Sequence, residues 1–266
     1  MLNRRTLTTA FIALGLSVGL ASQAQTSDQA LNDAIAGSWR SQAQTERDIY
    51  RHPAQSLTFW GLKPHMIVVE IDPGNGGWWL QILAPYAHKT DGHYIAGVRD
   101  PKDENFWKAV ADTSIYGKID AYALSDLPAG CADLVLVARA FHNWARQGDT
   151  TDNNMKIFYD TLKPGGILAV EQHRAPDGSD PKAGTGYVPE SYVIDAAIKA
   201  GFVLEARSEI NANPKDDHDH PFGVWTLKPT RSSSENGQPQ AADFDRAHYD
   251  AIGESDRMTL KFRKPS

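Results

Sequence analysis

The chain has 266 residues, of which 41% are hydrophobic and 23% charged, and its formal net charge at pH 7 is −6. This composition excludes a disordered chain and suffices for one globular domain with a sizeable core. An acidic chain without a basic stripe is a poor candidate for binding nucleic acid or an anionic membrane surface. Cys131 is the only cysteine, which excludes an internal disulfide.

Residues 1–24 have the pattern of a secretory signal peptide. Arg4 and Arg5 precede an uncharged, largely apolar stretch over 7–21, and residues 22–24 supply small side chains for signal peptidase. The stretch is too short to span a membrane, and no cysteine near the cleavage point offers a lipid anchor. The two arginines fit either Sec or twin-arginine export. We therefore expect a periplasmic or secreted protein without a membrane anchor that begins near Gln25.

Residues 25–64 are predicted to form an N-terminal helical segment. Apolar residues recur at helical spacing over 28–40 and predict an amphipathic helix. Residues 46–53 mix charges of both signs with an aromatic residue, and a plain surface loop is one interpretation of them.

A glycine-rich turn follows the first predicted strand. The β-branched run over 67–71 is typical of a parallel strand buried on both faces, and Pro-Gly-Asn-Gly-Gly over 73–77 ends it before a helix. A helix start leaves backbone N–H groups unpaired, and glycines let a ligand approach them. The turn therefore predicts a ligand site beside Glu70. A dinucleotide loop would instead place its acid about twenty residues later.

Strands and helices alternate along the rest of the chain. Strands are predicted over 92–98, 119–123, 132–138, 167–171, 202–206 and 257–263, and helices around 106–110, 152–161 and 189–200. This alternation predicts a doubly wound sheet. Because ligands of open parallel sheets lie outside the carboxyl ends of the strands, we expect residues 139–144 and 171–174 to face the site.

Two motifs carry a family resemblance. Glu70-x-x-x-Gly74-x-Gly76 resembles the first motif of class I S-adenosylmethionine-dependent methyltransferases, acid-x-Gly-x-Gly-x-Gly, although Asp72 stands where the first glycine belongs. Leu-Lys-Pro-Gly-Gly over 162–166, before an apolar strand, is similar to a later part of the same pattern. The resemblance covers roughly residues 65–263. It implies an α/β, Rossmann-like class I methyltransferase sheet of seven strands, the last antiparallel, with helices on both faces.

The resemblance also implies a cofactor, S-adenosylmethionine. The methionine end of the cofactor would be surrounded by Glu70, Asp72, Gly74 and Gly76. The extra carboxylate of Asp72 could crowd the cofactor's own carboxylate or hold its ammonium and sulfonium charge. Asp100 would bind the ribose hydroxyls, although it falls one residue late. Asp126 would contact the adenine, unless backbone and apolar contacts alone hold it.

The acceptor side is implied to contain His142, His173 and Arg174. His142 could take a proton from the acceptor or orient it, and the alternative is a histidine satisfied by neighbouring backbone. In this family the region before the first strand often closes over the acceptor, so 46–53 could be a lid whose polar contacts are Tyr50, Arg51 and His52.

A long insertion is expected at about 211–256 within the methyltransferase-like domain of residues 65–266. It contains Asp-Asp-His-Asp-His over 216–220, and such side chains bind first-row cations. Adjacent ligands on one extended segment point to opposite sides, so this segment cannot close a metal site alone. We predict no metal, and the alternatives are a polar lid near the acceptor and a solvated loop.

Four segments together resemble a group of exported bacterial proteins identified as predicted methyltransferases: residues 48–53, 73–78, 173–174 and 260–265. The sequence therefore predicts S-adenosylmethionine-dependent methyl transfer to an unidentified, small acceptor. The alternative is a catalytically inactive methyltransferase-fold protein of the periplasm that binds a ligand or a partner. A metal-dependent hydrolase using residues 216–220 is a third hypothesis.

Overall fold

A computed structural model describes residues 28–74, 77–148, 150–235 and 238–266. The predicted signal peptide and Gly76 lie outside these residues. In the described part of the chain no helix combines the length and the apolar character that crossing a membrane requires.

The sheet has the strand order β3-β2-β1-β4-β5-β8-β7. Its strands are β1 (Ile67–Ile71), β2 (His93–Val98), β3 (Ile119–Ala123), β4 (Ala132–Ala138), β5 (Leu162–Ala175), β7 (Val203–Ser208) and β8 (Arg257–Arg263). The two-residue β6 (Val188–Pro189) pairs with the end of β5. β8 runs antiparallel to both of its neighbours, β5 and β7, and the other pairs are parallel. The predicted seven-stranded class with an antiparallel last strand is confirmed.

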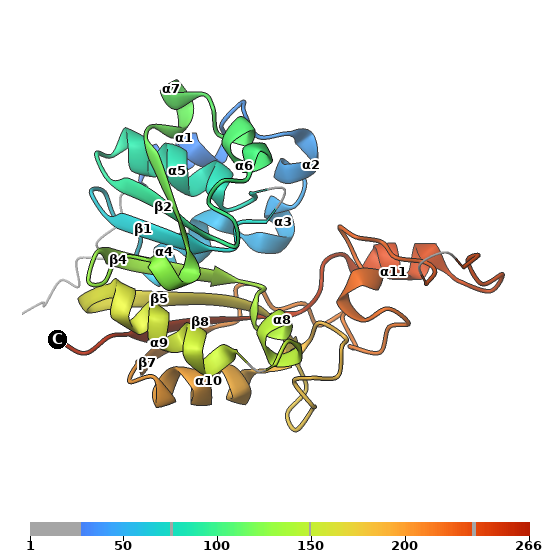
Figure 1. The fold of residues 1–266 in the computed structure, drawn as a ribbon. Coiled ribbons are helices and arrows are strands. Elements are labelled where there is room, and N and C mark those ends of the chain that lie inside the picture. Colours follow the sequence, from blue (N-terminus) through green and yellow to red (C-terminus); the bar gives the residue numbers. More distant parts are fainter. Residues whose placement is uncertain (1–27, 75–76, 149, 236–237) are drawn as a thin grey trace, which may run out of the picture.

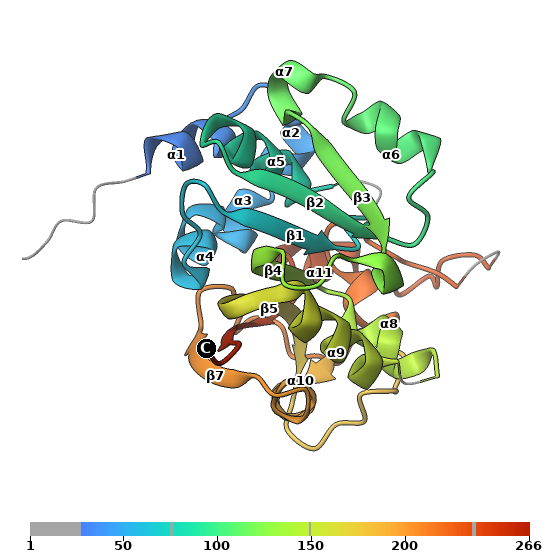
Figure 2. The same cartoon turned by 60° about the vertical axis from the view of Figure 1, so that its left-hand side comes forward.

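Helices cover both faces of the sheet (Figures 1 and 2). One face carries α1 (Gln29–Ile35), α4 (Pro53–Trp60), α5 (Leu80–Lys89), α6 (Glu104–Ala109) and α7 (Thr113–Tyr116). The other carries α8 (Phe141–Arg146), α9 (Thr151–Thr161) and α10 (Glu190–Lys199). Successive strand residues point to opposite faces, so Val68 packs into the first core and Val69 into the second. Burial on both faces explains the unbroken apolar runs.

The described part of the N-terminal segment consists mainly of short helices, which corrects one interpretation of residues 46–53. The interpretation of 46–53 as a plain loop is wrong, because helices α2 (Gln42–Thr45), α3 (Asp48–Arg51) and α4 follow one another there. His52 turns the chain between α3 and α4 with φ 42°, and Pro53 starts α4. The first helix ends at Ile35, earlier than predicted. After it the indole of Trp39 packs over Gly37, where a Cβ would lie 2.2 Å from the ring.

The insertion between β7 and β8 contains only two short helical elements among its described residues. These are the 3-10 turn η2 (Gly223–Thr226) and helix α11 (Arg246–Ile252). Figure 1 shows this segment, in orange and red, extending beyond the edge of the sheet at which α8 lies. A second 3-10 turn, η1 (Leu124–Asp126), precedes β4. The insertion therefore stands at the end of the sheet where ligands of this architecture bind.

Candidate active site at the carboxyl edge of the sheet

A cavity of about 880 Å³ lies at the carboxyl edge of the parallel strands. Its walls come from the turn after β1, the end of β2 with α6, the end of β4 with α8, and the insertion around η2. Small-molecule sites occupy about 300 to 1,000 Å³, so the volume suits one. Six residues singled out in the sequence line this cavity together: Arg51, Asp72, Gly74, Asp100, His142 and His173.

The turn after β1 has a left-handed backbone at three residues. Asp72 has φ 47°, Gly74 φ 73° and Gly77 φ 49°. Glycine adopts this region freely, and aspartate is among the few other residues that tolerate it. Asp72 can therefore replace the glycine of the motif without changing the path of the backbone, and its N–H donates to the carbonyl of Gly97 at 2.8 Å.

The Asp72 side chain lines the cavity and lies next to an arginine. Its Oδ2 lies 3.9 Å from Nε of Arg99, which occupies the position before Asp100 at the end of β2. Burial raises the pKa of Asp72, and the charge of Arg99 opposes that rise. Among the described residues, a Cβ added at Gly74 would have its nearest neighbour, the Asp72 carbonyl oxygen, at 4.0 Å.

Glu70 does not line the cavity. Its side chain is buried at the end of β1, and one oxygen accepts a hydrogen bond from the Tyr94 hydroxyl at 2.7 Å. Burial raises the pKa of Glu70 to about 8, so the carboxyl group is protonated at neutral pH. Its position favours a role beneath the turn, where it supports the backbone that the cavity exposes.

The two other predicted acids lie in different surroundings. Asp100 lines the cavity, and its Oδ1 accepts a hydrogen bond from the backbone N–H of Lys102 at 2.8 Å. Its Oδ2 has no hydrogen-bond partner among the described residues and remains available. Asp126 is exposed in η1, contacts Ser125, and is not part of the cavity wall.

Two neutral imidazoles stand side by side on the opposite wall. The rings of His142 and His173 are 5.8 Å apart between centroids. His142 Nδ1 lies 3.4 Å from Nε2 of Gln172, and His173 Nδ1 lies 2.5 Å from the hydroxyl of Ser255. Burial, reinforced by Arg146, lowers the pKa of His142 to about 4, and burial also lowers the pKa of His173 strongly. Both rings are therefore uncharged at neutral pH.

Arg174 follows His173 but does not line the cavity. Its guanidinium bonds Asp256 at 2.8 Å and Glu209 at 2.7 Å. These pairs join the end of β5 to the segment after β7 and to the start of β8, which gives Arg174 a structural role.

A buried charge cluster at the cavity wall was not predicted from the sequence, where only Arg51 was named, as a lid contact. Glu254 binds Arg47 at 2.6 Å, Arg51 at 2.9 Å and Arg257 at 2.7 Å. Arg257 also lies 3.0 Å from Glu171, whose other oxygen accepts a hydrogen bond from the Trp79 indole at 3.0 Å. Helices before β1 are thus tied to β8. The i, i+4 spacing of Arg47 and Arg51 and the i, i+3 spacing of Glu254 and Arg257 are the only local signals of this cluster.

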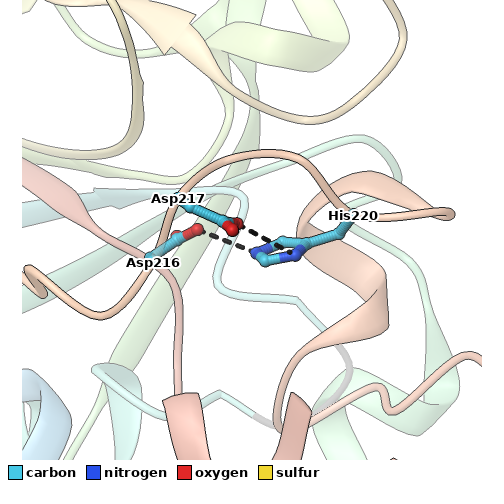
Figure 3. A group of neighbouring side chains, drawn as sticks. All are labelled: Asp216, Asp217 and His220. Atoms are coloured by element: carbon cyan, nitrogen blue, oxygen red, sulfur yellow. Dashed lines mark hydrogen bonds and ion pairs between the residues drawn. The ribbon is translucent and has the colours of Figure 1, made fainter. Parts of the chain in front are cut away.

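Asp216, Asp217 and His220 lie together, as Figure 3 shows, with ligand atoms within 4.8 Å of one another. The extended conformation assumed for this segment is wrong, because His218 has φ 67° and reverses the chain. Asp216 accepts hydrogen bonds from the Tyr187 hydroxyl, His220 Nε2 and the N–H groups of His218 and Asp256. Four donors thus engage its carboxylate, which fastens the insertion to the start of β8.

No family model and no curated protein sequence matches the chain. Solved structures do match. The [4+2]-cyclase SpnF is 14% identical, with 89% of this chain and 92% of that chain aligned and a TM-score of 0.52. The N-methyltransferase NodS from Bradyrhizobium japonicum is 16% identical over 85% of this chain and 99% of that one, with a TM-score of 0.50.

A third match is 1,6-didemethyltoxoflavin-N1-methyltransferase from Burkholderia thailandensis, whose structure holds 1,6-didemethyltoxoflavin and S-adenosylhomocysteine. It is 12% identical over 90% of this chain and 88% of that one, with a TM-score of 0.52. The fold is that of class I methyltransferases. At such identities the likeness concerns the fold, and one fold supports several reactions, as the name of SpnF illustrates.

Proposed function

We propose that this protein transfers a methyl group from S-adenosylmethionine to a small acceptor. The observation that carries the proposal is one cavity, at the carboxyl edge of a class I methyltransferase sheet, shared by the turn after β1, Asp100 and the His142–His173 pair. The acid residues lie on the β1 and β2 side and the imidazoles on the β4 and β5 side. The cavity therefore has a polar cradle at one end and a place for a second molecule at the other.

The residues of the cradle fit the cofactor. Oδ2 of Asp100 can accept hydrogen bonds from ribose hydroxyls, and Gly74, which has no close neighbour among the described residues, leaves room for the methionine portion. The Asp72 carboxylate offers a negative charge for the ammonium and sulfonium groups. Glu70, protonated behind the turn, would support the loop rather than touch the cofactor.

When bound, S-adenosylmethionine supplies a methyl group whose carbon bonds to the acceptor's nucleophilic atom while the carbon–sulfur bond breaks and its electron pair stays on sulfur. The protein contributes mainly proximity and orientation to such a displacement. His142 is neutral and a weak base, so it serves as a hydrogen-bond partner that orients the acceptor's nucleophile rather than as the final proton acceptor.

One observation favours a second function: the Arg139 guanidinium at the cavity wall is not paired with a carboxylate. A cationic wall binds an anion whether or not a cofactor is present. A methyltransferase-fold protein that binds a small anionic ligand without catalysis is therefore the rival.

Calorimetry of the purified protein with S-adenosylmethionine and S-adenosylhomocysteine separates these functions. We expect both to bind and Asp100→Asn to weaken binding at least about tenfold, as the loss of charge-assisted hydrogen bonds predicts. Asp126→Asn removes the same charge outside the cavity wall and is the matched control. No heat with either ligand, in protein shown to be folded, rejects methyl transfer and favours the rival.

Export is part of the same proposal. The pattern of residues 1–24 supports it, and so does a structure from Bordetella parapertussis described as a possible exported protein, 14% identical over 88% of this chain and 78% of that one, with a TM-score of 0.51. Cell fractionation tests it: we expect a chain shortened by about 24 residues in the periplasm or medium, and a full-length chain in the cytoplasm contradicts it.

A further inference from the structure

The wall of the cavity opposite the cradle has a net positive charge, because its arginines outnumber the buried glutamates beside them. In the buried charge cluster three guanidinium groups, those of Arg47, Arg51 and Arg257, pair with Glu171 and Glu254, and a fourth, that of Arg139, lies near enough to feel their charges. Both glutamates accept hydrogen bonds from the other arginines and from Trp79. Arg139 donates no hydrogen bond to either glutamate.

Arg139 is held at the wall by its backbone alone. It follows β4 with φ 58°, and its N–H donates to the carbonyl of Glu171 at 2.7 Å. Its guanidinium makes no hydrogen bond or ion pair with any described residue, and its Nε is buried without a partner. A guanidinium carries five N–H donors, and of those of Arg139 only the Nε donor is buried without a partner, so the group that lines the cavity has donors free for a ligand.

The surroundings of Arg139 confirm the imbalance. Burial lowers the pKa of Arg139, and the neighbouring arginines Arg47 and Arg257 lower it further, against the opposite pull of Glu171 and Glu254. Burial and the charge of Arg139 likewise lower the pKa of Arg51 strongly. An incoming anion would relieve both effects.

The two ends of the cavity carry charges of opposite sign among a mixed polar and apolar lining. Asp72, Asp100 and Asp103 line the β1 and β2 side, whereas Arg139 and Lys228 line the β4 and insertion side. On the latter side Glu254 is the only carboxylate among the described lining residues, and three arginines already bond it. The remaining lining there is neutral, with His142, Asn143 and Trp225 among it.

Arg51 and Arg139, the two arginines that line the cavity beside Glu254, lie against different parts of it. Arg51 lies over the Trp78 ring, 4.8 Å from its centroid, and so borders the turn that would hold the cofactor. Arg139 directly precedes α8, which carries His142 and Asn143. Arg51 is thus placed for the cofactor's carboxylate, and Arg139 for the second molecule.

We infer that the acceptor is an anion, a small molecule bearing a carboxylate that binds Arg139 in bidentate fashion with Lys228 nearby. The inference rests on the proposed function, because it names the acceptor class of the same site. Arginine is suited to this task because its planar donors match the two oxygens of a carboxylate. The methyl group would go to another atom of the acceptor, beside His142.

Benzoate and its neutral isostere benzamide test the inference without turnover. Binding of each is measured by calorimetry to the whole protein, alone and with saturating S-adenosylhomocysteine. We expect benzoate to bind in both conditions and benzamide to bind at least about tenfold more weakly. Arg139→Gln should weaken the binding of benzoate about tenfold to a hundredfold and leave the affinity for benzamide unchanged. Arg139→Lys should recover part of the loss.

Arg207→Gln is the matched control, because Arg207 is an exposed arginine on β7, away from the cavity. Thermal unfolding of each variant separates misfolding from lost binding, and Arg139→Gln should be no less stable than the parent protein because it removes an unbalanced cation.

Equal affinity for benzoate and benzamide, or an unchanged affinity in Arg139→Gln, overturns the inference. Displacement of benzoate by S-adenosylhomocysteine also overturns it, since Arg139 would then bind the cofactor's carboxylate. Benzoate binding without any S-adenosylhomocysteine binding would reject methyl transfer while leaving the anion site intact.

Discussion

The Glu70 carboxyl group accepts a 2.7 Å hydrogen bond from the Tyr94 hydroxyl, which joins the acid that ends β1 to the neighbouring strand β2. In the sequence Glu70 looked like a ligand of the cofactor. In the fold its hydrogen bond is made inside the protein, and the ligand-facing acid of the turn is Asp72.

Glu70→Gln should change how stability depends on pH. The pKa of Glu70 is raised from 4.5 to about 8 in the folded protein, so the folded state keeps a proton that the unfolded chain releases. The free energy of unfolding therefore falls between these two pH values, by up to about 5 kcal/mol, and levels off above about pH 8. Glutamine keeps the acceptor oxygen and cannot ionise, so the variant should lack this fall. Urea unfolding at several pH values measures it. Glu46→Gln, at an exposed site, should follow the parent protein, and parallel curves for Glu70→Gln and the parent contradict the prediction.

Substitutions of Asp72 separate two contributions to the stability of the turn, the left-handed backbone of this residue and the charge of its side chain. Because its φ is 47°, Asp72→Ala should lower the free energy of unfolding by about 1 kcal/mol, while Asp72→Gly should stay within about 0.5 kcal/mol of the parent. Chemical denaturation compares the two. Equal losses in both variants would mean that the contact with Arg99, not the left-handed backbone, decides the stability of the turn.

Glu254→Gln should be among the most destabilising single changes in the chain. It leaves Arg47, Arg51 and Arg257 with Glu171 as their remaining carboxylate, and breaking a buried pair in this way costs roughly 3 to 5 kcal/mol. The three arginines hold the pKa of Glu254 well below its usual range, so its contribution is present above about pH 4.5 and is lost as the pH falls below that value. Denaturation in urea measures both effects. Glu205→Gln, which breaks half-exposed pairs with Lys261 and Arg263, should cost less than about 1 kcal/mol.

His142 should remain uncharged across the physiological range. Its pKa is lowered to about 4 in the folded protein, so the ring NMR signal of His142 should not move between about pH 5.5 and 8. The same shift makes the free energy of unfolding fall by about 3 kcal/mol as the pH drops from 6.5 to 4, because the unfolded chain takes up a proton first. His142→Gln assigns the signal. A midpoint near pH 6.5 for that signal would show that the ring is solvated.

The sheet could be predicted from sequence because its causes are local. Strands such as β1 and β4 are buried on both faces, so they read as unbroken apolar runs bounded by glycine or polar residues. The topological rule that ligands lie at the carboxyl ends then placed His142 and His173 near one edge, and the family resemblance added Asp72 and Asp100; all four line the cavity.

The cationic wall could not be predicted in the same way. Arg51 and Glu254 are 203 residues apart in the chain, and nothing in the segment around Arg51 pointed to Glu254 as its partner. In the sequence Arg139 was noticed only as a neighbour of His142. Its unpaired guanidinium stands out only in the fold, where the other arginines bond the nearby carboxylates and Arg139 does not. The turn at His218 was missed because a histidine with positive φ has no distinctive sequence pattern.

The pairing of Arg47 and Arg51 with Glu254 also fixes when the protein can finish folding during synthesis. The arginines emerge from the ribosome early, but their partner arrives about two hundred residues later, and the Trp60 indole likewise awaits the Leu260 carbonyl. Until the last strand is made, the first helices have no place to bury these groups, and such distant contacts form slowly. A nascent chain held by the translation machinery therefore lacks the wall of its own binding site.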